Sequence, residues 1–329
     1  MRPCPPREAS DAATTPPEWR ADGLRFFAYG HHLKRKFGQR VQKVSLDAGF
    51  VCPNVDGTVA YGGCVFCDIK SFSPSRRQAF RGGIAEQLAH GMARVRSRYK
   101  KCDAFIAYFQ PSTNTRVQAH KLQDLIGAVF AEPAVRGVAV SARPDCLADD
   151  ILEVLADAAR EHYVVVELGI QSIHDESLAW MNRGHDAECS RVATRRCREL
   201  GLEVTGHVIL GLPTETESAM MATPLAIAEW GVTTVKLHNL MVIRGAPLNR
   251  VYAREPFELL SCDRYVRMVC DILERLPPDI RIDRIGGDAP PQDLVAPRWR
   301  LEKASLRKRI EDELARRGTW QGKKAEGGR

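Results

Sequence analysis

The sequence predicts an α/β protein with a parallel sheet. From residue 41 onward, six short β-rich runs alternate with helical patterns, which is typical of repeated βα units. The runs are almost continuously apolar, as expected for strands that helices cover. Each run ends in a polar, glycine-rich or proline-rich segment. The alternation alone leaves two architectures open, a curved barrel-like sheet and a doubly wound one. In both, active residues gather at the carboxyl ends of the strands.

The expected elements follow one another with short connections. Strands are expected at residues 41–48, 104–109, 137–142, 163–170, 202–212 and 232–240. Helices are expected at 84–99, 116–131, 147–161, 186–200 and 216–230. Beyond the sixth strand we expect a helix at 263–276, a short extra strand at 279–285 and a long basic helix at about 299–317.

The chain divides into three expected parts. Residues 1–22 are rich in Pro, Ala and Thr, which favours a disordered tail. Residues 23–245 hold the βα units, and residues 246–329 form a C-terminal extension with the basic helix. A length of 329 residues suits one large α/β domain with such an appendage.

Composition narrows the class of protein. We find no run of about 18 apolar residues and no apolar region near the start, so neither a membrane span nor a secretory signal is expected. The expected location is therefore the cytoplasm. Ten cysteines in such a chain indicate metal ligands and buried thiols rather than a disulfide framework.

The net charge of +7 is unevenly placed. Residues 298–329 hold 11 Lys and Arg against 5 Asp and Glu, and residues 31–43 and 76–101 are also basic. In the last segment, positions 300, 303 and 307 share one helical face, and position 308 lies at its edge. These four residues, Arg300, Lys303, Arg307 and Lys308, are candidates for contacting a polyanion. A solvated basic surface is the other interpretation.

The stretch "DAGFVCPNVDGTVAYGGCVFCDIKSF" (47–72) holds three cysteines and no fourth at ligand spacing. Thiolates are soft ligands that favour zinc or iron–sulfur clusters. A structural zinc site normally closes all four positions. A [4Fe–4S] cluster on three thiolates leaves one iron open for another molecule. The candidate metal ligands are Cys52, Cys64 and Cys67, and Gly62 and Gly63 let the backbone pass close to a cluster.

This stretch resembles the cluster-binding segment of radical S-adenosylmethionine (SAM) enzymes. Most members carry CxxxCxxC, whereas here eleven residues separate Cys52 from Cys64. A long first gap is familiar in the branch that is similar to the radical-SAM domain of the Elongator catalytic subunit. The chain resembles most a bacterial family with the pattern CPN.DGT….GGC.FC, over about residues 24–323. The resemblance implies an incomplete (βα)6 radical SAM barrel with a C-terminal helical extension.

The resemblance also implies the cofactors and the chemistry. The cofactors are a [4Fe–4S] cluster and S-adenosyl-L-methionine, and reductive cleavage of SAM at the cluster yields a 5′-deoxyadenosyl radical. An electron donor such as flavodoxin or ferredoxin is the implied protein partner. The class of the final reaction stays open, with transferase and lyase types both possible.

The family's motifs point to a SAM pocket formed by the strand exits. The segment "YFQPSTNT" replaces the usual Gly-Gly-Glu form, "SARPD" resembles the branch's RPD motif, and "ELGIQS" and "HVILGLP" match its later strands. An arginine suits the methionine carboxylate through its bidentate fork. Carried over by motif, the candidate SAM contacts are Gln110, Ser112, Asn114, Ser141, Arg143, Asp145, Glu167, Gln171 and Ile209.

Several other polar residues are less readable. Arg183 and His185 of "NRGH" are expected near the pocket. His238 lies on an apolar strand, where a histidine satisfied within the core is the commoner outcome. Arg284 and Asp288 flank Gly286–Gly287 and are substrate-side candidates. Cys146 could face the pocket, although packing is favoured. The cysteines expected only to pack are Cys102, Cys189, Cys197, Cys262 and Cys270, and Cys4 lies in the expected tail.

The motifs do not identify the substrate. Basic segments and the Elongator-like resemblance favour tRNA, with the side chain of a wobble uridine as the expected target. Two alternatives stay open. One is a radical SAM enzyme that acts on a small molecule or a protein. The other is a zinc-stabilised nucleic-acid-binding protein without radical chemistry.

Overall fold

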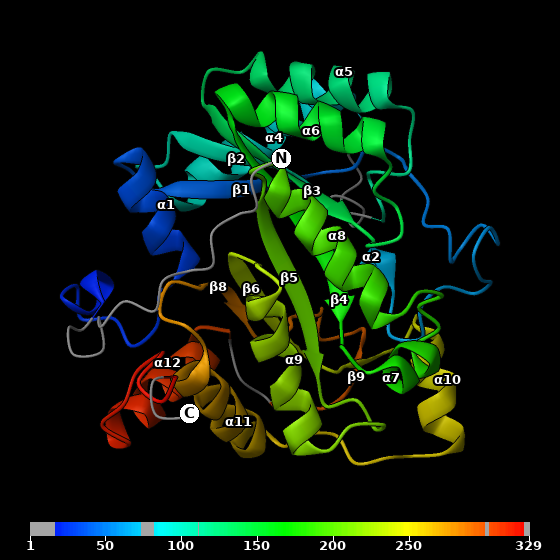
Figure 1. Cartoon of the computed structure of the whole chain (residues 1–329), viewed down its shortest axis with the longest axis vertical. Helices are drawn as coiled ribbons and strands as arrows, with labels where there is room; N and C mark the ends of the chain where they lie inside the picture. Colours follow the sequence, from blue (N-terminus) through cyan, green and yellow to red (C-terminus); the bar gives the residue numbers. More distant parts are fainter. Residues whose placement is uncertain (1–16, 74–81, 111, 300–302, 326–329) are drawn as a thin grey trace.

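A single curved sheet of seven parallel strands organises the protein (Figure 1). The structure is a computed structural model that describes residues 17–73, 82–110, 112–299 and 303–325. The strand order is β1-β2-β3-β4-β5-β6-β8, and every pair is parallel. The strands are β1 (Val41–Leu46), β2 (Ala104–Phe109), β3 (Val135–Ala142), β4 (Tyr163–Gln171), β5 (Glu203–Leu210), β6 (Thr234–Asn239) and β8 (Arg281–Ile285). A separate antiparallel pair consists of β7 (Val242–Ile243) and β9 (Leu294–Ala296).

The strand order decides between the two expected architectures. A doubly wound sheet reverses its order at a switch point. Here the strands follow one another in chain order and no reversal occurs, so the sheet curves in one direction into an incomplete barrel. The predicted fold class, an incomplete (βα)6 barrel with a C-terminal extension, is confirmed. The extra strand expected at 279–285 is β8, and it extends the sheet beyond β6.

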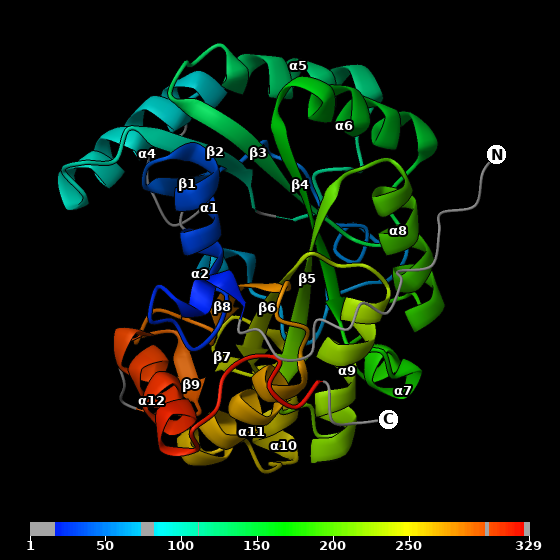
Figure 2. The same ribbon diagram turned by 60° about the vertical axis from the view of Figure 1, so that its left-hand side comes forward.

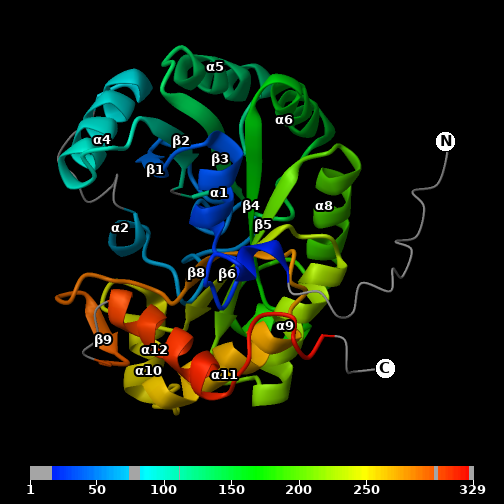
Figure 3. The same ribbon diagram turned by 90° about the vertical axis from the view of Figure 1, so that its left-hand side faces the viewer.

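Helices cover the outside of this sheet in an arc (Figure 3). Along the arc they are α4 (Ile84–Arg98), α5 (Ala119–Phe130), α6 (Asp149–Glu161), α8 (Ala187–Glu199), α9 (Glu217–Glu229), α11 (Cys262–Arg275) and α12 (Lys303–Arg316). The last two lie side by side near the β8 edge (Figure 2). Shorter elements are η1 (Glu18–Arg20), α1 (Tyr29–Phe37), α2 (Ile69–Phe72), α7 (Asp175–Trp180) and α10 (Pro247–Arg254). None of the helices in the described residues combines the length and apolar character that crossing a membrane requires.

Alternation along each strand separates an outer core from the barrel interior. On β2, Phe105 and Phe109 belong to the large core under the covering helices, where Leu122 of α5 is also buried. Ile106 and Tyr108 point the other way, into the interior. Both faces are apolar at the amino ends of the strands, which explains the nearly continuous apolar runs in the sequence.

Helix α1 fills the amino end of the barrel, and the sequence did not predict it. Its Tyr29 and Leu33 pack with Ile106 and with Tyr163 at the start of β4. The Tyr29 and Tyr163 hydroxyl oxygens lie 3.2 Å apart. Ala28 forms a parallel bridge with Ile282 of β8, so the segment before α1 reaches the far edge of the sheet. This end is therefore filled with side chains of the described residues.

Part of the expected N-terminal tail lies within the described residues and packs against the protein. Residues 1–16 lie outside the described part of the chain, but Glu18–Arg20 form a turn of 3-10 helix. Trp19 is only 3% exposed, and its Nε1 donates to the Pro278 carbonyl at 2.9 Å. A buried indole with a satisfied N–H anchors this segment against the C-terminal half. The part of the expected tail from Glu18 to Arg20 is therefore helical.

Candidate active site

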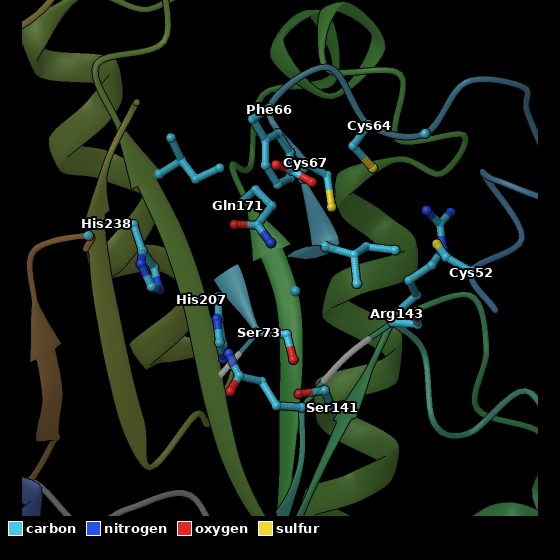
Figure 4. A pocket seen from close by; sticks show the side chains of 18 of the residues that line it. Cys52, Cys64, Phe66, Cys67, Ser73, Ser141, Arg143, Gln171, His207 and His238 are labelled. Atoms are coloured by element: carbon cyan, nitrogen blue, oxygen red, sulfur yellow. The ribbon is translucent and has the colours of Figure 1, made fainter. Parts of the chain in front are cut away.

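A cavity of about 760 Å³ opens at the carboxyl ends of the strands. The loops after β1, β2 and β3 line one side, and β4, β5, β6 and the turn after β8 line the other. Figure 4 shows the three cysteines Cys52, Cys64 and Cys67 gathered on one side, with Gln171 in the middle and His238 across from them. All three cysteines line the cavity, as the sequence predicted.

The cysteine loop is fastened to the loop that carries "NRGH". Asn54 is fully buried, and its Nδ2 donates to the Asn182 carbonyl and, at 3.4 Å, to the Cys64 sulfur. Asn182 in turn donates to the Gly63 carbonyl at 2.9 Å. Arg183 Nη1 donates to the Cys64 sulfur at 3.3 Å. The Cys64 sulfur thus accepts from both Asn54 and Arg183, so the cysteine loop and the loop that carries "NRGH" meet at this sulfur.

The three thiols suit a cationic metal cluster. Burial and, to a lesser extent, the neighbouring Cys64 and Cys52 together raise the pKa of the Cys67 thiol to about 12. Three neighbouring thiolates, of which Cys64 is buried and Cys52 and Cys67 are half-buried, need bound positive charge to coexist. In the described ranges no three His, Cys, Asp or Glu side chains surround one metal-ion position. A [4Fe–4S] cluster is bound by thiolates on separate irons and does not require that geometry.

Most of the predicted SAM contacts line the cavity. Those that do are Gln110, Ser112, Ser141, Arg143, Glu167, Gln171 and Ile209. Ser112 and Gln171 have φ values of 62° and 74°, in the left-handed region that non-glycine residues seldom adopt. Ser112 Oγ is buried and has no hydrogen-bond partner within the described residues. Strained residues with unused polar atoms are typical of ligand sites.

Arg143 combines an ion pair with an unused donor. Its Nε and Nη2 donate to the Asp145 carboxylate at 2.9 and 2.7 Å, and Nη2 also donates to the Arg183 carbonyl. Its Nη1 is buried without a partner in the described part of the chain. Arg143 is 3% exposed, so this free donor can be satisfied only by a ligand or water in the cavity.

Four residues that the sequence associated with the pocket do not line it. Asn114 is buried, and its Nδ2 donates to the Phe109 carbonyl at 3.0 Å, so it joins the exits of β2 and β3. Asp145 holds Arg143, and His185 contacts Arg183 at 3.1 Å. Cys146 also lies outside the lining. These residues position the cavity wall or support it. The sequence associated them with the pocket because motif spacing cannot tell a residue that lines a cavity from the neighbour that holds it.

Glu167 is the centre of a buried ionic cluster under the cavity. Its Oε1 accepts from Lys43 Nζ at 2.7 Å. Its Oε2 accepts from the Tyr108 hydroxyl at 2.6 Å, from His207 Nε2 at 2.9 Å and from Lys236 Nζ. Burial would raise the pKa of Glu167, but Lys236 and Lys43 outweigh burial and hold it well below the usual range. Glu167 thus lines the cavity as predicted, with both carboxylate oxygens already engaged.

The ionic cluster also ties together the two edges of the sheet. Asp283 of β8 accepts from Lys43 of β1 at 2.7 Å and lies 3.3 Å from Lys236. Two lysines and two carboxylates balance in formal charge, which is what burial of charges requires. The motifs in the sequence did not point to Lys43, Lys236 and Asp283. Charged residues on otherwise apolar strands, two of each sign, were the available signal.

Two histidines form the wall opposite the cysteines. His207 and His238 stack with ring centroids 5.4 Å apart and an interplanar angle of 18°. Burial, then the charge of Arg284, holds the pKa of His238 well below its usual value, so its ring is neutral. His238 lines the cavity, and its Nε2 is buried without a partner among the described residues. The expectation of a satisfied core histidine is therefore wrong.

The basic C-terminal helix is less available to a polyanion than its composition suggests. Arg307 pairs with Glu311 at 2.8 Å, and Lys308 pairs with Asp312 at 2.8 Å. Arg300 and the side chain of Lys303 lie outside what the structure describes. The two candidates that are described thus have acidic partners one helical turn away.

Comparison with known proteins places this site in a family context. A sequence model of the Radical SAM superfamily matches residues 60–223, and one of the Radical SAM C-terminal domain matches residues 232–316. The chain is 38% identical over 302 residues to YtqA of Bacillus subtilis (strain 168), which covers 91% of this chain and 92% of YtqA.

More distant similarities reach proteins of the Elongator type. Over 160 residues the chain is 28% identical to the tRNA uridine(34) acetyltransferase of Methanocaldococcus infernus, which covers 47% of this chain and 29% of that protein. The structure of Methanocaldococcus infernus Elp3 with an N-terminus deletion (1–46) matches with a TM-score of 0.64 at 17% identity. That match covers 85% of this chain and 64% of the other. At this identity the likeness concerns the fold alone.

Proposed function

The chain belongs to the radical SAM superfamily as an enzyme with a [4Fe–4S] cluster and SAM as cofactors, and from this premise we propose that it modifies a uridine side chain in tRNA. The observation that supports tRNA as the substrate is the similarity over 160 residues to a tRNA uridine(34) acetyltransferase. The overall excess of positive charge agrees with a polyanionic substrate. The wobble position is the specific target that we propose.

We assign the metal ligands to Cys52, Cys64 and Cys67. In support, the three thiols line one side of a single cavity, and Arg183 donates to the Cys64 sulfur. The chemistry that the bound cofactors supply in this superfamily is one-electron reductive cleavage of SAM to a 5′-deoxyadenosyl radical. The protein's contribution is to hold these cofactors and the substrate in one enclosed space.

The SAM contacts that we propose lie between the cysteines and the ionic cluster. Arg143 would offer its unpaired Nη1 to the methionine carboxylate, because its other donors are already used by Asp145 and a carbonyl. Gln171 projects into the middle of the cavity (Figure 4). Gly169 leaves the space that such a ligand needs: a Cβ there would lie 3.0 Å from Gln171 Nε2 and 3.5 Å from Arg183 Nη2.

The test compares modified nucleosides in total tRNA from wild-type and deletion cells. The deletion strain should lose or accumulate one modified uridine. A plasmid that encodes the wild-type protein should restore the profile, and Cys64→Ala should not. Cys262→Ala is the matched control, because Cys262 lies on α11, outside the cavity lining, and should restore the profile fully.

A second measurement separates the substrate from the chemistry. Purified, anaerobically reconstituted protein should form 5′-deoxyadenosine from SAM when it is reduced. If it does so while the tRNA profile is unchanged by deletion, the tRNA proposal fails, and a small-molecule or protein substrate takes its place. A protein that binds zinc and not iron would contradict the assignment of the three cysteines.

A further inference from the structure

We propose that Arg284 and His238 form a subsite for an anionic group of the substrate, on the cavity wall opposite the cysteines. This inference rests on the proposed function, because it requires a second molecule beside SAM in the same cavity. It adds a chemical requirement that membership of the superfamily does not imply. The part of the substrate that reaches this wall carries a carboxylate or a phosphate.

Arg284 is an uncompensated cation in the cavity wall. It is half-buried and lines the cavity, yet it makes no hydrogen bond or ion pair with any residue in the described ranges. Arg284 is not needed to balance the charge of the buried ionic cluster, because Lys43 and Lys236 are already balanced by Glu167 and Asp283. The guanidinium nitrogens of Arg284 are not among the buried unpartnered atoms of the described residues, so they are open to the cavity, where a guanidinium can bind an anion through its bidentate fork.

Asp288 does not fill this role. It lies four residues beyond Arg284, at the rim of the cavity, where it is exposed to solvent. The two side chains form no ion pair within 4.0 Å in the part of the chain that the structure describes. The turn between them is tightly packed, because a Cβ at Gly287 would lie 2.5 Å from Met241 Cε. Arg284 itself lies on β8 and pairs with Lys236 of β6 in the sheet register, so its backbone is fixed at the wall.

His238 supplies the second group of the subsite. His207 Nε2 is fixed by Glu167 at 2.9 Å, and the His238 ring stacks on this immobilised imidazole. Both rings lie across the cavity from the cysteines (Figure 4). The unpartnered Nε2 of His238 can donate one hydrogen bond to an anion that Arg284 holds, since a neutral imidazole has one N–H.

Two sources of the anion fit this chemistry. One is a carboxylate on the substituent of the uracil ring, and the other is a nucleotide phosphate. Both accept a bidentate contact from a guanidinium. SAM brings a separate anion, its methionine carboxylate. On our assignment that carboxylate binds Arg143, on the cysteine side of the cavity.

The test measures equilibrium binding to the cluster-loaded full-length protein with SAM present. The probes are uridine, uridine 5′-monophosphate and 5-carboxymethyluridine, which share one ring and differ in their anion. We expect one anionic probe to bind about tenfold or more tighter than uridine, as one charge-assisted contact allows. Arg284→Gln should abolish that difference, Arg284→Lys should keep part of it, and His238→Phe should reduce it several-fold.

Arg250→Gln serves as the matched control, because Arg250 is an exposed arginine of α10 outside the cavity lining. Equal binding of all three probes to the wild type would overturn the subsite. So would an Arg284→Gln protein that still prefers the anion, or one whose affinity for SAM falls as much as its affinity for the probe. Iron content and melting temperature verify that each variant is folded. SAM cleavage by the wild type is scored separately, so a failed subsite and a failed radical SAM assignment give different results.

Discussion

Replacing Glu167 with Gln should destabilise the protein, because four donors converge on this one carboxylate. The substitution keeps the shape of the side chain and removes its charge. The new amide group faces donors that it cannot accept from, and Lys43 and Lys236 keep only Asp283 as an acidic partner. Removing one member of a buried ion pair costs about 3–5 kcal/mol.

The expected shift in melting temperature follows from the size of the chain. An unfolding entropy of about 2.1 cal/mol/K per residue gives roughly 0.7 kcal/mol/K for 329 residues. The melting temperature of Glu167→Gln should therefore fall by about 4–7 °C, measured by circular dichroism or calorimetry. Glu188→Gln is the control, because Glu188 makes an equally short pair with Arg191 on the exposed face of α8. It should leave the melting temperature unchanged.

The effect should also depend on pH in a defined direction. The pKa of Glu167 in the folded protein lies well below its usual value of 4.5. A carboxyl group with a depressed pKa contributes its full stabilisation above the unfolded-state value and loses it as the pH falls toward the folded-state value. The gap between wild type and Glu167→Gln should thus be constant from about pH 7 to pH 5.5 and shrink below about pH 4.5. A melting temperature within about 1 °C of wild type at pH 7 would refute this account of the ionic cluster.

Three further outcomes are expected. Replacing any one of the three cavity cysteines with Ala should remove the iron–sulfur absorbance and SAM cleavage, whereas Cys262→Ala should keep the iron content of the wild type; a full cluster in any of the three variants would contradict the ligand assignment. Arg143→Lys should weaken SAM binding about tenfold or more in calorimetry, because a lysine cannot hold Asp145 and a second carboxylate together; unchanged affinity would remove Arg143 from the pocket. Replacing Arg307 and Lys308 together with Ala should change the salt dependence of tRNA binding by clearly less than the slope of about 1.8 that two lost phosphate contacts would give, since both side chains already have acidic partners. A decrease of about 1.8 in this slope would indicate that Arg307 and Lys308 both contact RNA phosphates.

The local pattern of the chain predicted the sheet well. All six βα units and the extra strand were found within a few residues of their expected positions, because periodicity and strand composition act locally. The end of the first strand illustrates what causes these small differences between expected and observed bounds. Residues 41–48 were expected, but β1 ends at Leu46, where the Asp47 side chain accepts from the Gly49 amide and Gly49 adopts a φ of 79°. An aspartate that closes a turn on its own backbone competes with the strand.

The three candidate metal ligands could be proposed from the sequence for a similar reason. Cys52, Cys64 and Cys67 lie within sixteen residues of one another, so their spacing already limits how far apart they can be. Helix α1 was missed because its role is tertiary. Its basic sequence places Tyr29 and Leu33 four residues apart on one helical face, and these two side chains fill the end of a barrel that other segments build.

By itself, the sequence determined the order of the elements, the three thiols and the motif-bearing strand exits, since each depends on residues close together in the chain. The tertiary structure decided which polar residues are partners. Lys43 and Asp283 come from the two outer strands of the sheet, 240 residues apart, and meet only because the sheet curves until its edges face each other. Among the residues that the structure describes, the same curvature leaves Arg284 without a hydrogen-bond or ion-pair partner and His238 with an unpartnered ring nitrogen, both lining a cavity. Pairing across a closed surface depends on distance in space, and no local pattern in the chain encodes that distance.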